Sequence, residues 1–455
     1  MKGLRVPFLA FLGGSLFFLF FNLWGRSLEN HDYLRYAEVA KEMIRSGDWV
    51  VPRLNGEIFL HKPPLLFWLI AIPSKLYGEV TPFLARLPSA LFAWIGVLVV
   101  YFWGRTLWKG ERYGLISAGV LLSSYLYFWQ GRIARTDMVF SVLILLSLYF
   151  FYLAYPGRKI GLHGLSFFFM GLAGLTKGPV GILFPLSLMI LFLMTRRELR
   201  LLLRKEFLIG YLGVVFLFGL WLVPFLHHVG WDEALRVWRE TKILTRKAPF
   251  YLYGYRVWLD FAPWSIFLPS LVLYYWKKER NPDETFLILW FLGLFSLLTL
   301  FPVRAPKYLL PALPALALLM GGFWRTRAPI LLGVISLAAI VTWHGYELKL
   351  IQGNEKRSRG MVIEKALRPY RKENLFAYQM DVDLLTKINF YGDPIVPQVK
   401  GIEGLIQATA GKKEAFVITP QKVAEGLIEV GFRITPIKFI ENKGMNFLLV
   451  KIHPS

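Results

Sequence analysis

Long apolar stretches dominate the chain and alternate with short polar segments. A run of about 16 to 23 apolar residues spans the roughly 30 Å hydrocarbon core of a bilayer as an α-helix. The chain has about eleven such runs, with charges only at or near their ends, at about 6–24, 82–104, 114–130, 138–155, 161–176, 179–195, 207–228, 262–276, 285–302, 308–323 and 329–346. The pattern predicts a polytopic α-helical membrane protein with about 11–13 transmembrane helices.

Basic residues predict how these spans are oriented. Lys2 and Arg5 precede the first run, which lacks a small-residue cleavage site and is expected to stay as a span with its N-terminus inside. Alternation from there places five basic clusters in cytoplasmic loops, namely Arg105/Lys109/Arg112, Arg158/Lys159, Arg196/Arg197/Arg200/Arg204/Lys205, Lys277/Lys278/Arg280 and Arg325/Arg327. An odd number of spans then puts the C-terminal part on the outer side.

Three polar regions are predicted on that outer side. Residues 25–80 form a loop with amphipathic helices at about 32–46 and 63–77, expected to lie in the interface plane, and 229–261 form a second loop. After the membrane domain, 1–346, residues 357–455 alternate short apolar runs with helix-like segments. This predicts a small C-terminal extracytoplasmic α/β domain.

Composition agrees with this class and excludes several chemistries. Charged residues make up 18% of the chain, below the roughly 25% of globular proteins. The absence of cysteine excludes disulfides, thiolate metal sites and a cysteine nucleophile. The net charge of +23 is compatible with nucleic acid, an anionic membrane surface or an anionic substrate, but basic cytoplasmic loops explain most of it. We expect no nucleic-acid partner.

Acidic residues are scarce, and none falls in the middle of an apolar run. An ion-coupled transporter carries ionisable groups near the bilayer midplane. The distribution therefore argues against such a transporter and favours a site at the outer membrane–water boundary.

Two segments of the first outer loop carry candidate chemistry. Asp32 and Arg35 are spaced to share a helix face, although an N-cap Asp with a surface ion pair is the ordinary explanation on spacing alone. His61 and Lys62 precede a helix opened by prolines, where a snorkelling lysine is the ordinary explanation.

Two later outer segments add an acid and more cations. Asp137 precedes a span, where it or Thr136 could serve as a helix cap. Lys177 lies in the next outer turn, and a further outer segment carries Arg304, Lys307 and Tyr308. Together the cations Arg35, Lys62, Lys177, Arg304 and Lys307 could hold a phosphate, or simply reflect the basic residues common in membrane-protein loops.

A series of motifs distinguishes these possibilities. The chain contains Asp32-Tyr33-Leu34-Arg35-Tyr36-Ala37-Glu38, Gly47-Asp48-Trp49-Val50-Val51-Pro52-Arg53-Leu54-Asn55-Gly56, Lys62-Pro63-Pro64-Leu65, Ala85-Arg86-Leu87-Pro88-Ser89, Arg135-Thr136-Asp137-Met138, Leu175-Thr176-Lys177-Gly178-Pro179-Val180, Arg246-Lys247-Ala248-Pro249-Phe250-Tyr251-Leu252-Tyr253, Phe261-Ala262-Pro263-Trp264-Ser265 and Lys307-Tyr308-Leu309-Leu310-Pro311. In this order the motifs resemble bacterial polyprenyl-phosphate-sugar glycosyltransferases of the aminoarabinose transferase and protein O-mannosyltransferase type. The resemblance covers most of the membrane part.

The resemblance implies a C-type glycosyltransferase fold and a donor sugar on a polyprenyl phosphate such as undecaprenyl phosphate. Asp32 matches the essential acid of the family and Asp137 a second acidic position, so both are candidate catalytic residues. Physically, a carboxylate near the anomeric carbon can deprotonate a hydroxyl acceptor or stabilise positive charge. The resemblance assigns the donor phosphate to the candidate binding residues Arg35, Lys62, Lys177, Arg304, Lys307 and Tyr308.

The chain also departs from the family pattern at the positions that bind a metal ion in the aminoarabinose branch. Family members commonly have Asp-Glu where this chain has Asp32-Tyr33, and Glu-Lys-Pro-Pro where it has His61-Lys62-Pro63-Pro64. The later metal-binding histidine corresponds to Thr241, after Glu240. A divalent ion on His61 and Glu240 and the loss of the metal site both stay open, because two ligands do not define a site.

The sequence thus predicts an integral-membrane glycosyltransferase of the cytoplasmic membrane whose active site faces the outer, periplasmic side. The expected acceptor is a lipid-linked glycan such as the lipid A region. Protein O-glycosylation is the alternative enzyme activity, and a lipid-sugar flippase or exporter is the alternative outside enzymes. The nearly uncharged spans disfavour a flippase, which needs a polar path through the bundle.

Overall fold

The computed structural model describes residues 5–25, 27–28, 31–155, 159–240, 248–301, 303–324, 329–355, 366–370, 374–392, 395–412, 414–442 and 445–453. The chain divides into two compact units. The first comprises residues 1–23, 60–69 and 86–350, and the second comprises residues 24–59, 70–85 and 351–455.

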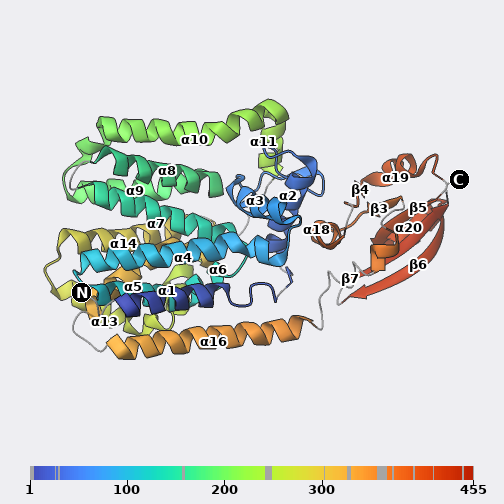
Figure 1. Cartoon of the computed structure of the whole chain (residues 1–455). Coiled ribbons are helices and arrows are strands. Elements are labelled where there is room, and N and C mark those ends of the chain that lie inside the picture. The colour runs from blue at the N-terminus through green and yellow to red at the C-terminus, as the bar shows by residue number, and fades with distance from the viewer. Residues whose placement is uncertain are drawn as a thin grey trace. The chain divides into compact units, whose positions relative to one another are not determined.

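The first unit is a bundle of apolar helices. Its segments are α1 (Arg5–Phe20), the start of α3 (Leu65–Tyr77), most of α4 (Pro82–Leu107), α5 (Glu111–Ser123), α6 (Tyr125–Gly131), α7 (Thr136–Ala154), α8 (Ile160–Lys177), α9 (Val180–Thr195), η1 (Leu199–Leu203), α10 (Lys205–Val229), α11 (Trp231–Glu240), α12 (Leu252–Asp260), η2 (Trp264–Phe267), α13 (Leu268–Lys277), α14 (Pro282–Leu300), η3 (Pro306–Ala312), α15 (Leu313–Phe323) and most of α16 (Pro329–Glu355). Helices α7, α8, α9 and α14 lie side by side in this bundle (Figure 1).

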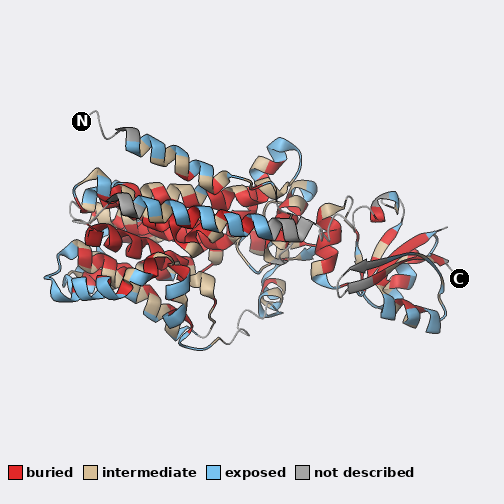
Figure 2. Ribbon diagram, turned by 90° about the horizontal axis from the view of Figure 1, so that it is seen from below, coloured by how far each residue is buried: buried red, intermediate tan, exposed pale blue. Residues whose placement is uncertain are grey.

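Burial increases toward the centre of the bundle. Buried residues fill its interior, and exposed residues lie along its outer sides (Figure 2). Within their most apolar windows, 78% of α7 but only 22% of α10 is buried, so α7 is central and α10 peripheral. An apolar side exposed along a helix of this length is compatible with lipid contact.

The helices confirm a polytopic α-helical membrane protein, because each of the eleven predicted spans falls on a helical segment. In the described part of the chain, six helices are long and apolar enough to cross a membrane, or up to seven if α12 and the η2–α13 segment, bent by 112°, count as one span. Fewer helices meet this length than the 11–13 predicted because several apolar segments are short or interrupted. For example, Ser124 adopts an extended conformation and separates α5 from α6.

The second unit joins the first polar loop to the C-terminal domain. The loop contributes α2 (His31–Ser46), the hairpin strands β1 (Arg53–Leu54) and β2 (Glu57–Ile58), and the end of α3. The C-terminal part contributes η5 (Arg368–Tyr370), β3 (Leu375–Tyr378), α18 (Val382–Tyr391), β4 (Gln398–Val399), α19 (Gly401–Thr409), β5 (Ala415–Pro420), α20 (Gln421–Glu429), β6 (Arg433–Asn442) and β7 (Met445–His453). The apolar side of α2, including Ala37, Ala40 and Met43, is buried.

The C-terminal strands form one mixed sheet in the order β4-β3-β5-β7-β6. Strands β4, β3 and β5 are parallel, whereas β7 runs antiparallel to both β5 and β6. Alternation of side chains along the strands creates two cores, one containing Leu385 of α18 and the other containing Leu405 of α19 and Leu427 of α20. The predicted small α/β domain is therefore confirmed from residue 366 onward, while 357–365 lie outside the described residues.

Candidate functional site

The bundle brings Asp137 and Lys177 together at the junction of two antiparallel helices. Asp137 lies in the first turn of α7, and Lys177 lies in the last turn of α8. Helix α8 ends there because Gly178, with φ 75°, adopts a backbone conformation that favours glycine, and Pro179 follows it. Each charge therefore lies at the helix end whose dipole favours it.

Asp137 is the centre of a cluster of cations. Lys177 donates a hydrogen bond from Nζ to Oδ1 of Asp137 at 2.5 Å. Oδ2 of the same carboxylate lies 3.3 Å from Nε of Arg135 and 3.7 Å from Nζ of Lys307. We call these four residues the Asp137 cluster. Three cations and one carboxylate give the cluster a net charge of +2.

The cluster is enclosed but not sealed. The Asp137 side chain is 2% exposed, whereas those of Lys177, Arg135 and Lys307 are 9%, 14% and 20% exposed. Aromatic rings cover the lysines: Nζ of Lys177 lies 4.5 Å from the ring centre of Phe140 and 5.2 Å from that of Tyr308. A partly enclosed surplus of positive charge is suited to an anion that arrives from outside.

Helix capping does not explain Asp137. The N-cap of α7 is Arg135, and no side chain makes a capping hydrogen bond at this end. The ordinary explanation considered from sequence, that Thr136 or Asp137 caps the span, is therefore wrong. The carboxylate is held by cations from two other segments, α8 and η3, which the sequence places 40 and 170 residues away.

Arg132 fixes the segment that leads into α7. Its guanidinium donates to Oε2 of Glu347 in α16 at 2.9 Å and to three main-chain carbonyl oxygens at the end of α1, those of Phe18, Leu19 and Phe21. Its side chain is 1% exposed. Because four acceptors use its donors, Arg132 acts as a rigid support three residues before Arg135.

Arg304 lies in the same outer segment as Lys307 but has other partners. Its guanidinium donates twice to the carbonyl oxygen of Thr299, at 3.0 and 2.8 Å, and once to that of Ala248 at 2.8 Å. These bonds tie the end of α14 to the loop before α12. Arg304 therefore braces the segment that carries Lys307 and Tyr308, and its predicted phosphate contact stays a prediction.

The other predicted site residues lie on different segments. His61 is exposed and Lys62 half-buried in the stretch before α3, and Glu240 is exposed at the end of α11. No group of three or more His, Cys, Asp or Glu side chains that could hold a metal is found among the described residues, and Thr241, Arg246 and Lys247 lie outside them. The divalent metal ion stays a prediction.

Asp32 and Arg35 belong to the second unit. Asp32 is half-buried in the first turn of α2, and Arg35 follows one turn later. Nη2 of Arg35 lies 2.6 Å from Oδ1 of Asp383 in α18. Sequence reasoning did not anticipate Asp383, because no local pattern links two charges 348 residues apart. Phe140 was detectable, since it lies one turn after Asp137 on α7.

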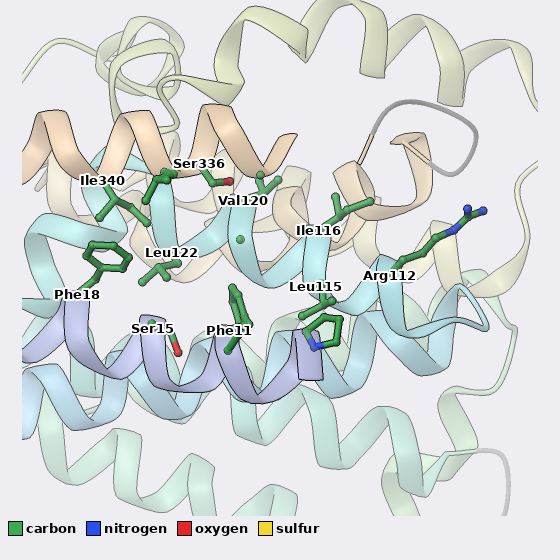
Figure 3. Close-up of a pocket in the computed structure, with 16 residues that line it drawn as sticks. Phe11, Ser15, Phe18, Arg112, Leu115, Ile116, Val120, Leu122, Ser336 and Ile340 are labelled. Atoms are coloured by element: carbon green, nitrogen blue, oxygen red, sulfur yellow. The ribbon is translucent and has the colours of Figure 1, made fainter. Parts of the chain in front are cut away.

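A groove of about 370 Å³ lies elsewhere in the bundle, between α1, α5 and α16 (Figure 3). Its lining is mainly apolar, with Arg112 at one end and Phe18 and Ile340 at the other. None of the predicted site residues lines it. Its chemistry suits an apolar chain rather than a phosphate.

Helices and charged site together define a multi-span membrane protein with the C-type glycosyltransferase fold. The structure is similar to that of ArnT from Cupriavidus metallidurans bound to undecaprenyl phosphate, with a TM-score of 0.80 over 98% of this chain and 97% of that chain at 19% sequence identity. At that identity the likeness establishes the fold.

Sequence comparison identifies the family. An uncharacterized protein of Aquifex aeolicus is 30% identical over 341 residues, covering 74% of this chain and 67% of the relative. The undecaprenyl phosphate-alpha-4-amino-4-deoxy-L-arabinose arabinosyl transferase 1 of Pseudomonas fluorescens is 29% identical, covering 64% of this chain and 52% of the relative. Residues 61–227 match the family described as dolichyl-phosphate-mannose-protein mannosyltransferase.

This chain belongs to the polyprenyl-phosphate-sugar glycosyltransferase family. The matches span about half to two thirds of the length of these curated relatives. The resemblance noted from the motifs is thereby confirmed.

Proposed function

We propose that this protein transfers a sugar from a polyprenyl phosphate such as undecaprenyl phosphate to a lipid-linked acceptor such as lipid A. The observation that carries the proposal is the Asp137 cluster, a partly enclosed site of net charge +2 in a fold shared with a chain bound to undecaprenyl phosphate. Relatives named as arabinosyl transferases that use such a donor support it.

The role of the cations follows from where charge develops during sugar transfer. An acceptor oxygen forms a bond to the anomeric carbon as the bond from that carbon to the donor phosphate oxygen breaks, so negative charge grows on the leaving phosphate. Lys177 and Lys307 stabilise this charge by charge-assisted hydrogen bonds. The oxygens of Asp137 already face three cations. Asp137 is therefore better suited to positioning the lysines than to accepting a proton.

Asp32 is our candidate base for a hydroxyl acceptor. Its carboxylate would take the proton that the hydroxyl loses as the new glycosidic bond forms. An acceptor phosphate has no such proton to lose and would need no base. The assignment rests on the family resemblance of the segment around Asp32, Arg35 and the start of α2.

We further propose that the protein lies in the cytoplasmic membrane with its site on the outer side. The junction of α7 and α8 that carries Asp137 and Lys177 is at the ends of these helices opposite to the ends joined by residues 155–159, whose basic residues Arg158 and Lys159 predict a cytoplasmic position. A polyprenyl phosphate in the outer leaflet would present its phosphate at this level.

The test uses purified full-length protein in phospholipid vesicles, radiolabelled undecaprenyl-phosphate sugars and a lipid extract. We expect transfer by the wild type, loss of transfer in Asp32→Asn at unchanged thermal stability, and a donor KM raised about tenfold or more in Lys177→Met. Lys278→Met, which removes a cation from another segment of the bundle, is the matched control and should keep wild-type kinetics.

Three outcomes would change the proposal. Equal transfer by wild type and Asp32→Asn would make Asp32 structural. Transfer to peptide but not to lipid acceptors would favour protein O-glycosylation, which the match of residues 61–227 to a protein mannosyltransferase family supports as the second candidate. No transfer over a broad donor and acceptor panel, together with movement of labelled lipid across the bilayer, would replace the enzyme with a flippase.

A further inference from the structure

The groove between α1, α5 and α16 lies within the membrane-spanning bundle. Its walls are the helices of three predicted spans, 6–24, 114–130 and 329–346. Arg112 lies at one end of the groove, and Phe18 and Ile340 bound the other end (Figure 3). A groove of about 370 Å³ with a mainly apolar lining offers room for hydrocarbon and few hydrogen-bond partners for water.

The length of the groove matches one leaflet of a bilayer. Along α1 its lining runs from Pro7 to Phe18, and along α5 it runs from Arg112 to Leu122. At about 1.5 Å per residue these stretches are about 16 and 15 Å long, which is half of the roughly 30 Å hydrocarbon core. One acyl chain of a phospholipid therefore fits the groove, whereas the longer chain of a polyprenyl phosphate would extend beyond it.

Two glycines keep the groove open. Gly14 of α1 and Gly333 of α16 both line it, and a Cβ added at either position would have no heavy atom within 4 Å. Leu337 lines the groove from α16 and is 53% exposed. The open space and the exposed leucine together form an apolar surface that a hydrocarbon chain would cover.

Positive charge gathers at the end of the groove where Arg112 lies. The loop between α4 and α5 and the start of α5 carry the exposed cations Arg105, Lys109 and Arg112 and one carboxylate, Glu111, so this segment has a net charge of +2. The guanidinium of Arg112 also donates to the hydroxyl of Tyr113. These basic residues predict a cytoplasmic position, where basic pockets between spanning helices bind the headgroups of anionic lipids.

We infer that the groove binds one acyl chain of an anionic phospholipid of the cytoplasmic leaflet, with the headgroup at Arg112. The apolar lining selects the chain, the length of the groove selects a single leaflet, and the net positive charge selects an anionic headgroup. The choice of leaflet rests on the proposed orientation. The site itself goes beyond the proposed function, because it requires no sugar transfer.

A bound chain would fasten the first part of α16 to the bundle. The later part of this helix is held by Trp343, whose Nε1 donates to the carbonyl oxygen of Ser123 at 3.0 Å, and by the ion pair of Glu347 with Arg132 at 2.7 Å. The groove lies along the earlier part, from Gly333 onward. A phospholipid that binds there should therefore raise the midpoint of thermal unfolding.

The experiment uses full-length protein in phosphatidylcholine vesicles that contain phosphatidylglycerol with a photoreactive diazirine in its acyl chain. Illumination should attach this lipid to peptides of α1, α5 and α16 at the groove, as identified by mass spectrometry. Gly14→Leu fills the groove and should lower this labelling about fourfold or more, the factor for one displaced CH₂ group.

Gly13→Leu is the matched control for the groove. It makes the same change one residue earlier on the same helix, where an added Cβ also has no heavy atom within 4 Å, but Gly13 does not line the groove. Its labelling should equal that of the wild type. Gly333→Leu fills the groove from α16 and repeats the test if Gly14→Leu does not fold.

A second pair of variants tests the headgroup. Arg112→Gln should lower the preference for photoreactive phosphatidylglycerol over photoreactive phosphatidylcholine about fivefold. Arg204→Gln removes another exposed cation on the predicted cytoplasmic side, at the start of α10, and should leave this preference unchanged.

Three results would overturn the inference. Equal labelling of the groove peptides in wild type, Gly14→Leu and Gly333→Leu would remove the site. Equal labelling by the two phospholipids would remove the anionic headgroup. Competition by undecaprenyl phosphate but not by unlabelled phosphatidylglycerol would assign the groove to a polyprenyl chain instead. None of these readouts depends on sugar transfer, so this inference and the proposed function can fail separately.

Discussion

Replacing Asp137 by asparagine tests the electrostatic design of the Asp137 cluster. The substitution keeps the size of the side chain but raises the net charge of the cluster from +2 to +3. At an effective dielectric constant of about 20, attraction to Lys177 at 2.5 Å, Arg135 at 3.3 Å and Lys307 at 3.7 Å is worth about 6.6, 5.0 and 4.5 kcal/mol before desolvation.

Desolvation offsets most of that attraction, so the net effect is smaller. Removing one partner of a buried ion pair costs about 3 to 5 kcal/mol. Because Lys307 and Arg135 are 20% and 14% exposed and can turn toward solvent, we expect about 2 to 4 kcal/mol for Asp137→Asn. The loss should appear as a lower midpoint of thermal unfolding in detergent.

Added phosphate should partly reverse this loss. Three cations without a carboxylate bind an anion more tightly, and a ligand at ten times its Kd stabilises the folded state by about 1.4 kcal/mol. Phosphate should therefore raise the unfolding midpoint of Asp137→Asn more than that of the wild type. Asp260→Asn is the matched control: Asp260 is buried but paired with one arginine, Arg256, so its variant should lose stability without the enhanced phosphate response.

The reasoning would be refuted by either of two results. If Asp137→Asn unfolded at the same midpoint as the wild type, the carboxylate would not offset the repulsion among the three cations. An equal phosphate response in wild type, Asp137→Asn and Asp260→Asn would mean that phosphate acts on the whole protein through general salt effects rather than on this cluster.

Three further predictions concern packing, capping and pH. Gly181→Ala would place a Cβ 2.2 Å from the α8 backbone, so it should separate α9 from α8 and lower the unfolding midpoint clearly, whereas Gly164→Ala, with open space around it, should not. Lys41→Met removes the hydrogen bonds from Nζ of Lys41 to the carbonyl oxygens at the end of α18, so it should destabilise the second unit by about 2 kcal/mol and speed amide exchange in α18. Lys451→Met breaks the more exposed ion pair with Glu414 and should change neither the stability nor the exchange rate. Burial raises the pKa of the Glu42 carboxyl above its ordinary 4.5, so the folded state binds this proton more tightly than the unfolded state. The resulting stabilisation is complete below pH 4.5 and is lost as the pH rises through the raised pKa. Over this pH range the midpoint of thermal unfolding should fall as the pH rises, and Glu42→Gln should remove this dependence.

The sequence predicted those parts of the structure that depend on local pattern. Apolar runs placed the helices of the bundle, and the short alternating runs at 375–378, 415–418 and 447–450 correspond to β3, β5 and β7. Amphipathic spacing also placed α2 and α3 close to their observed bounds. Such features are readable because helix and strand periodicity is set within a few residues.

Contacts between distant segments were not readable in the same way. Asp137, Lys177 and Lys307 were selected one by one, but only the packing of α7, α8 and η3 shows that they share one site. The partners of Arg304 and Arg35 depend on chain crossings that leave no local signal, so both were predicted to bind phosphate without their carbonyl and carboxylate partners being foreseen.

The contacts of Arg132 constrain the order in which the helices of the bundle assemble during synthesis. Its carboxylate partner, Glu347, lies 215 residues further along the chain. At about 5 to 20 residues per second, a ribosome needs about 10 to 40 s to reach it. Throughout that interval the guanidinium lacks the carboxylate that balances its charge, and a buried cation without a counter-charge is costly. In a chain that ended before α16, Arg132 would keep its carbonyl acceptors at the end of α1 but lack the carboxylate of Glu347, so the buried charge is balanced only once α16 has joined the bundle.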